Sequence, residues 1–178
     1  KYKDQVIMPD PRESGTAADL IAAMVDQWGE DKTWELFDKL FDNGMIVQGA
    51  NGPALDQVTS GSRGIVMGGV DYSAYSAKAK GEPLEVVIPS SGTTVTPRPV
   101  MILKTTDNKD AAEAFVDFMF SDEAQEISAS KNMIPANTDI APKNGPKLEE
   151  IETLNEDLDG IASSSKDVKE KFAERYLK

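Results

Sequence analysis

The sequence contains neither cysteine nor histidine. Without cysteine the chain cannot form disulfides or provide thiolate nucleophiles and thiolate metal ligands, and without histidine it lacks the commonest general base. An enzymatic reading would have to depend on carboxylates, lysine, tyrosine or serine. Since no paired base and nucleophile stands out, we predict no catalytic residues, no metal site and no cofactor.

Basic segments and long apolar runs are also missing. The 178 residues carry 19 Lys and Arg against 31 Asp and Glu, a formal net charge of −12. This balance argues against nucleic acid or an anionic membrane surface as a partner. No apolar run approaches the roughly 18–20 residues that cross a bilayer. The apolar share of 39% is enough for one sizeable core, alone or with a smaller appendage.

Over residues 1–90, short apolar runs alternate with segments of helical periodicity, the pattern of an α/β lobe with a mostly parallel sheet. Trp34, Phe37, Leu40 and Phe41 recur at helical spacing and predict a core-facing stripe, with Gly44 at the expected left-handed helix end. The predicted strands are 6–8, 45–48, 64–69 and 84–89, and the predicted helices are 14–27, 31–43, 53–60 with Pro53 first, and 71–81.

The second half of the chain is less regular. Residues 100–104 form a continuous apolar run that predicts a strand, and Asn108 and Ser121 are expected to cap the two helices that follow. Residues rich in Pro, Asn, Lys and Gly at 135–147 predict an exposed connection. Two polar amphipathic helices are then expected at about 147–158 and 166–177, the last one capped by Ser165.

Four stretches together resemble a known family. They are the strand leading into "DPRESGT", the block "ANGPALDQVTSGSRGIVMGGVDY", the run "PVMILKTTDNKDAAEAFVDFMFSDEAQEI", and "NMIPANTDI". Together they are similar to the extracellular solute-binding proteins of ABC importers, in the branch that includes ferric-ion, thiamine and phosphonate binders. The third stretch is the most specific, and the resemblance covers nearly the whole chain.

The resemblance implies a lobe of the type II periplasmic-binding-protein fold and a ligand in the cleft between two lobes. By the family's chain path, residues 1–98 form the second lobe, 99–140 return to the first lobe, and 141–178 supply helices that pack on the second. The chain then resembles a C-terminal fragment without most of its N-terminal lobe. Segment 100–134 would pack on its own lobe in an unusual way or swap onto a neighbouring chain as a homodimer.

Ser14, Gly15 and Thr16 open the first long helix and are the leading candidates for contact with a ligand. Unpaired N–H groups in a helix's first turn and the positive end of its dipole favour an anion, and glycine permits close approach. Taken alone, the pattern favours simple capping by Ser14. The family resemblance implies that this tripeptide contacts the anionic group of the ligand.

Asn51, Asp71 and Tyr72 complete the predicted ligand-binding set. Asn51 belongs to an ordinary Asn-Gly turn by sequence alone, and the resemblance implies that it faces the same cleft. Ferric-ion binders of the family carry two adjacent tyrosines where this chain has Asp71 and Tyr72, and only Tyr72 matches. Gly69 also replaces an asparagine of that pattern. The departures favour a small ligand with one anionic and one cationic or hydroxylated end, such as a zwitterionic phosphonate, over ferric ion.

The resemblance therefore implies a periplasmic or extracellular solute-binding component that delivers its solute to ABC permease subunits, with a cell-surface lipoprotein as one form. Two alternatives stay open at this stage. One is an enzyme on the same lobes that uses a cleft carboxylate such as Asp71 as acid or base. The other is an extracellular sensor or scaffold that no longer binds a solute.

Overall fold

The computed structural model describes residues 1–154 and 157–177, and divides them into two units. The first unit comprises Lys1–Thr96 with Glu152–Lys178, and the second comprises Pro97–Ile151. The assignment of 1–98, 99–140 and 141–178 to separate lobes, and the swapped homodimer, stay predictions. Among the described residues, no helix is both long enough and apolar enough to cross a membrane.

A parallel sheet of three short strands forms the centre of the first unit, in the order β2-β1-β3. The strands are β1 (Val6–Met8), β2 (Ile46–Val47) and β3 (Ile65–Val66). Ile7 of β1 pairs with Ile46 on one side and with Val66 on the other. The predicted α/β fold with a parallel sheet is confirmed.

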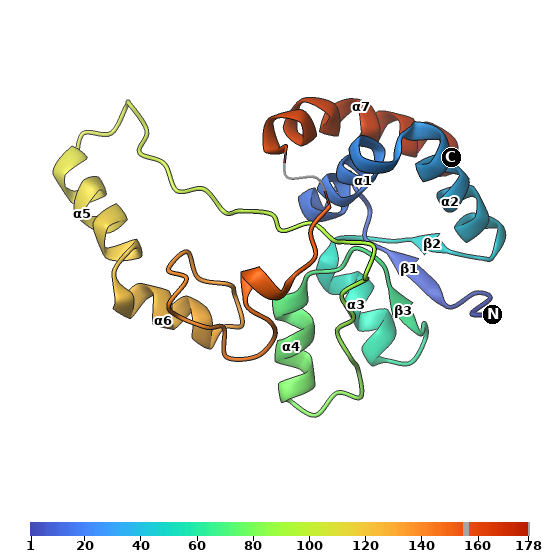
Figure 1. Ribbon diagram of the computed structural model, residues 1–178, viewed down its shortest axis with the longest axis horizontal. Helices are drawn as coiled ribbons and strands as arrows, with labels where there is room; N and C mark the ends of the chain where they lie inside the picture. Colours follow the sequence, from blue (N-terminus) through green and yellow to red (C-terminus); the bar gives the residue numbers. More distant parts are fainter. Residues whose placement is uncertain (155–156, 178) are drawn as a thin grey trace. The chain divides into compact units, whose positions relative to one another are not determined.

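Helices cover both faces of this sheet. Figure 1 shows α1 (Gly15–Trp28), α2 (Glu30–Asp42) and α7 (Leu158–Tyr176) on one side, and α3 (Asn51–Thr59) and α4 (Asp71–Ala79) on the other. The sides follow from topology, because the chain moves from β1 to β2 in one direction and then returns past β1 to β3. Right-handed crossovers in opposite directions place their helices on opposite faces.

The core lies where α1, α2 and α7 meet above β1. Helix α1 packs against α7, and small alanines on α1, including Ala22 and Ala23, are buried in the same core as Phe172 of α7. Phe37 of α2 and Phe172 of α7 are fully buried, with their rings 5.3 Å apart in an edge-to-face arrangement. The predicted core stripe of α2 is therefore confirmed. Trp34 is also buried, and Leu40 and Phe41, the other two residues of the stripe, pack against the core.

Tyr176, at the end of α7, locks that helix onto α2. Its ring stacks on Phe41 at a centroid distance of 4.3 Å, and its Oη donates a hydrogen bond of 2.6 Å to Asp38. Arg175 forms an ion pair of 3.1 Å with the same carboxylate. Burial, followed by the hydrogen bond to Asp38, raises the pKa of Tyr176 to about 12.

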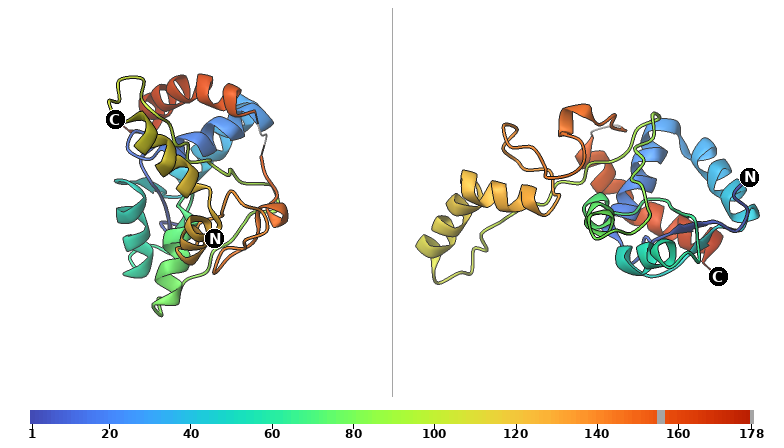
Figure 2. Two further views of the ribbon diagram at one scale, coloured as in Figure 1. Left: turned by 90° about the vertical axis from the view of Figure 1, so that its left-hand side faces the viewer. Right: turned by 90° about the horizontal axis from the view of Figure 1, so that it is seen from below.

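The second unit consists of α5 (Lys109–Met119), α6 (Asp122–Ser130), a single 3-10 turn at Leu148–Glu150 and connecting chain (Figures 1 and 2). Ser121 caps α6 as predicted, accepting a hydrogen bond from the amide of Ala124. The buried side chain of Gln125 ties the following loop to α6, because its Oε1 accepts the amides of Ala136 and Asn137 at 2.7 and 3.1 Å.

Two predicted strands are wrong. Residues 84–89 have no ladder, since Pro83 and Pro89 flank them without amide donors and Val87 is 79% exposed. Residues 100–104 form no strand pairing and end in a turn, with Met101 71% exposed. A strand requires a neighbour to form its hydrogen bonds, and the described part of the second unit holds no other strand. The apolar pattern was suited to a strand, but this unit supplies no partner for it.

Several predicted helix limits also need correction. A helix was expected at 147–158, but over residues 147–154 the structure has only a single turn at Leu148–Glu150. Residues 155 and 156 of that prediction lie outside the described residues. The last helix begins at Leu158, well before the predicted cap Ser165, and Asp157 caps it by accepting the amide of Gly160. Helix α3 begins at Asn51, which makes Pro53 its third residue.

The hydroxyl of Thr33 is the one buried side-chain polar atom in the described residues without a hydrogen-bond partner. We expect Thr33→Val to raise the free energy of unfolding by about 1 kcal/mol, because it removes an unsatisfied polar group and keeps the shape. Urea unfolding measures the change. Thr33→Ser is the matched control, since it keeps the hydroxyl, removes a methyl group and should destabilise. Equal stability of Thr33→Val and the wild type would contradict the expectation.

The raised pKa of Tyr176 predicts a loss of stability at high pH. The folded state holds this phenol neutral to about pH 12, whereas in the unfolded chain it ionises near the ordinary tyrosine pKa of 10.0. Its contribution is therefore complete below pH 10 and is lost as the pH rises through 12. Tyr176→Phe should lower stability at pH 8 by about 1 kcal/mol, and the difference from wild type should shrink at pH 11.5 in urea titrations. Tyr2→Phe, at an exposed tyrosine, is the matched control for the urea titrations.

Candidate functional site

The predicted site residues lie at the starts of three helices along one edge of the sheet. Ser14 immediately precedes α1, Asn51 is the first residue of α3, and Asp71 is the first residue of α4. Each of these helices follows one of the three parallel strands, so all three begin at the edge where the strands end. Ligands of open α/β sheets bind at this edge.

Ser14 is a helix cap and a hydrogen-bonding centre at once. Its Oγ accepts the amide of Ala17 at 3.2 Å, which confirms capping as a structural role. The same Oγ donates to Oδ1 of Asn51 at 2.9 Å and lies 3.1 Å from Oγ1 of Thr16. Ser14 is only 2% exposed. Its position is therefore fixed by both helices and not by α1 alone.

Asn51 closes the contact from the other helix. Its Nδ2 donates to Oγ1 of Thr16 at 3.3 Å, while its Oδ1 accepts from Ser14. The structure thus joins Ser14 and Thr16 to Asn51, which is 37 and 35 residues away from them in sequence, in one network. We call these three side chains the polar cluster.

Gly15 leaves space beside the polar cluster. A Cβ atom added to Gly15 would meet no atom within 4 Å, and the residue is exposed. Within the described residues, the amides of Gly15 and Thr16 have no protein partner. They belong to the first turn of a helix of 14 residues, whose N–H groups and dipole favour negative charge. Chemically, the cluster with these amides is a set of neutral hydrogen-bond donors.

Asp71 and Tyr72 begin α4 at the same edge of the sheet. Oδ1 of Asp71 accepts the backbone amide of Tyr72 at 2.8 Å, and the carbonyl of Tyr72 accepts the hydroxyl of Ser76. Asp71 is exposed and Tyr72 half-buried. The pair adds an anionic acceptor and a phenol to an edge that otherwise offers donors. Among the described residues, no group of three or more Asp or Glu side chains is arranged to hold a metal ion.

Sequence reasoning missed Asp10 and Arg12, which form the loop before Ser14. The carboxylate of Asp10 accepts the backbone amide of Arg12 at 2.8 Å, its Nε at 3.0 Å and its Nη2 at 2.6 Å. Hydrogen bonds from the Arg12 side chain are the main cause that lowers the pKa of the Asp10 carboxyl. The signal was present in "DPR", because an Asp two residues before the amide that it accepts is the pattern of an Asx turn.

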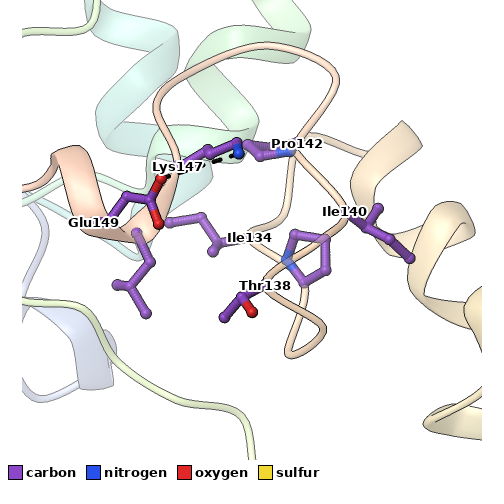
Figure 3. A pocket seen from close by; sticks show the side chains of 8 residues that line it. Ile134, Thr138, Ile140, Pro142, Lys147 and Glu149 are labelled. Atoms are coloured by element: carbon purple, nitrogen blue, oxygen red, sulfur yellow. Dashed lines mark ion pairs between the residues drawn. The ribbon is translucent and has the colours of Figure 1, made fainter.

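A shallow hollow, open to solvent, lies in the second unit and includes none of the predicted site residues (Figure 3). Ile134, Ile140 and Leu148 give it apolar walls. Lys147 and Glu149 face each other at 4.0 Å across one side. Its small, mostly aliphatic lining offers little to orient a polar solute.

Comparison with known proteins places the chain in a family. Residues 1–157 match the family described as bacterial extracellular solute-binding protein. An uncharacterised protein of Haemophilus influenzae is 33% identical over 130 residues, covering 72% of this chain and 37% of that protein. A sulfate-binding protein of Salmonella typhimurium is 28% identical over 180 residues, covering 91% of this chain and 53% of that protein.

Solved structures agree. The periplasmic binding protein AfuA from Actinobacillus pleuropneumoniae, with exogenous fructose-6-phosphate bound, has a TM-score of 0.83 at 29% identity, covering 97% of this chain and 56% of AfuA. Iron-bound HitA from Pseudomonas aeruginosa shares the fold at a TM-score of 0.75 and 19% identity, covering 96% of this chain and 57% of HitA.

The chain spans about half the length of most of these relatives. Those with a stated role are binding proteins and not enzymes, which confirms the predicted class, the type II fold and the extracellular or periplasmic setting of the family. The enzyme alternative is thereby set aside. The chain belongs to the family of bacterial extracellular solute-binding proteins.

Proposed function

We propose that this chain provides one side of the binding site of an ABC importer's solute-binding protein, and that the solute is small and carries a tetrahedral oxyanion. The observation that carries the proposal is the polar cluster, in which Ser14 and Thr16 meet Asn51 at the sheet edge. The same protein would deliver its solute to permease subunits in the membrane.

The donors of this site suit an oxyanion. The Thr16 hydroxyl, the second N–H of the Asn51 side-chain amide and the two unpartnered amides of α1 can surround a phosphate, phosphonate or sulfate group without a buried positive charge, while the Ser14 hydroxyl holds Asn51 in place. A hydrogen bond to a charged group contributes about 1.5–3 kcal/mol. Three or four such bonds amount to roughly 5–12 kcal/mol, a range that includes the about 8 kcal/mol of micromolar binding.

Asp71 and Tyr72 favour a ligand with a second, different polar end. A carboxylate repels another anion but accepts hydrogen bonds from an amino group or from sugar hydroxyls. We therefore favour a zwitterionic phosphonate or a hydroxylated phosphate ester over ferric ion. The similarity to iron-bound HitA at 19% identity concerns the fold alone. AfuA with fructose-6-phosphate and the sulfate-binding protein, at 29% and 28% identity, support an oxyanion.

A thermal-shift panel on the complete gene product tests the proposal. The panel contains fructose 6-phosphate, 2-aminoethylphosphonate, phosphate, sulfate, a polyamine, thiamine and ferric ion. A large shift confined to oxyanions supports it, because a ligand bound only by the folded state raises stability with concentration. A shift with ferric ion alone overturns it. The absence of a thermal shift with every compound of the panel favours the sensor or scaffold alternative.

Thr16→Val should weaken binding of the best oxyanion without damaging the fold. The substitution removes the hydroxyl that Asn51 contacts and keeps the branched shape, and a loss of about tenfold or more in affinity is expected from one lost donor. Isothermal titration calorimetry measures it. Thr59→Val is the matched control, since Thr59 lies at the far end of α3 and its hydroxyl donates to the carbonyl of Asp56. Unchanged affinity in Thr16→Val would contradict the assignment.

Gly15→Ala distinguishes an effect on ligand affinity from an effect on the stability of the fold. The added methyl group meets no protein atom within 4 Å, so unfolding by heat in the absence of ligand should stay unchanged or improve slightly. If the oxyanion approaches the amide of Gly15, the methyl group should reduce its affinity by about tenfold or more, as measured by titration calorimetry. Full affinity together with full stability would show that the ligand lies elsewhere.

A further inference from the structure

The loop between β1 and α1 is fixed to both arms of the polar cluster. The carbonyl of Asp10 accepts the amides of Glu13 and Ser14 at 2.9 and 2.8 Å, which folds the loop back on itself. The amide of Asp10 donates to the carbonyl of Gly49 at 2.7 Å, in the loop that leads to Asn51. Asp10 therefore connects the two backbone segments that carry Ser14 and Asn51.

One edge of the Arg12 guanidinium is bound to this loop. Nε and Nη2 both donate to the carboxylate of Asp10. The Asp10 side chain is only 7% exposed, whereas that of Arg12 is 54% exposed. Among the described residues, Nη1 of Arg12 has no hydrogen-bond partner. The buried carboxylate thus orients a cation whose remaining donors face solvent.

Arg12 and Ser14 are two residues apart, so their Cα atoms are within about 7 Å of each other. An arginine held by its Nε edge keeps donors on its other side, and the planar guanidinium matches the spacing of phosphoryl oxygens. Because Asp10 has already restricted the side chain, little rotamer entropy remains to be lost when an anion binds. The position, geometry and free donors all suit contact with an anion at the polar cluster.

We propose that Arg12 is a ligand-contacting residue, which supplies the positive charge for the oxyanion bound by the polar cluster, and that Asp10 positions it. This inference rests on the proposed function. It specifies the ligand class further, since a fixed guanidinium beside neutral donors favours a doubly charged phosphate, phosphonate or sulfate over a carboxylate.

Another role for Arg12 is to neutralise the buried carboxylate of Asp10, and the test must separate the two. Arg12→Gln alone would leave that carboxylate unpaired and could weaken binding through repulsion or damage to the loop. Asp10→Asn removes the charge and keeps the oxygen that accepts the Arg12 amide. We therefore compare Asp10→Asn with the double variant Asp10→Asn/Arg12→Gln, in which no buried charge is left unpaired.

The measurement is titration calorimetry on the complete gene product with fructose 6-phosphate, inorganic sulfate and methylphosphonate as probes. If Arg12 contacts the anion, the double variant should bind about ten- to a hundredfold more weakly than Asp10→Asn, the range for a hydrogen bond to a charged group. Its binding should also depend less on salt concentration, because one charge contact is gone. Asp10→Asn/Arg12→Lys should recover part of the affinity. Thermal unfolding without ligand confirms that each variant folds.

The outcomes distinguish this inference from the proposed function. Equal affinities of Asp10→Asn and the double variant, with binding still sensitive to Thr16→Val, overturn the role of Arg12 and leave the oxyanion site standing. If neither the wild type nor the variants bind any of the three probes, both the role of Arg12 and the proposed oxyanion site are overturned.

Discussion

Parallel pairing of three short strands is the constraint on which the candidate site depends. Because β1, β2 and β3 run in the same direction, the chain leaves all three at one edge and starts a helix each time. Residues separated by dozens of positions are thereby brought to a common edge. The contact of Ser14 with Asn51 follows from this topology.

The strands are too short to hold this arrangement alone. With two or three residues each, they contribute few ladder hydrogen bonds, and stability must come from helix packing. The packing is supplied mainly from a distant part of the chain, where Phe172 and Tyr176 of α7 insert against Phe37 and Phe41 of α2. The rigidity of the polar cluster at the start of α1 therefore depends on a helix that contributes nothing to the site itself.

Much of the first unit was predictable, because its local signals agree with its tertiary contacts. The cap at Ser14, the apolar stripe of α2 and the order of strands and helices follow from periodicity and capping alone. The contact between Ser14 and Asn51 was not predictable from the residues, since Asn-Gly fits an ordinary turn equally well. Only the sheet order brings them together. The Asp10 carboxylate bound to Arg12 was missed because capping patterns mark helix starts and not the loop before them.

The failures have two causes. Residues 84–89 and 100–104 have the composition of strands, yet a strand exists only where a second strand pairs with it, and no local pattern reveals whether one does. The last helix was expected to begin only after Ser165, because that serine suggested a cap. Serine hydroxyl groups inside a helix can instead bond to carbonyls of the preceding turn, as Ser164 does to Gly160, and the helix continues.

The packing of α7 on α1 has a consequence for synthesis. Helix α1 spans Gly15–Trp28 and its partner α7 spans Leu158–Tyr176, so the core of the first unit joins segments that are far apart in the chain. A ribosome releases α7 long after α1 and α2, and until then the apolar faces of these two helices lack their cover. Contacts between such distant segments form slowly, and exposed apolar surface in the meantime promotes aggregation. The core of the first unit therefore cannot be completed until α7 has been made.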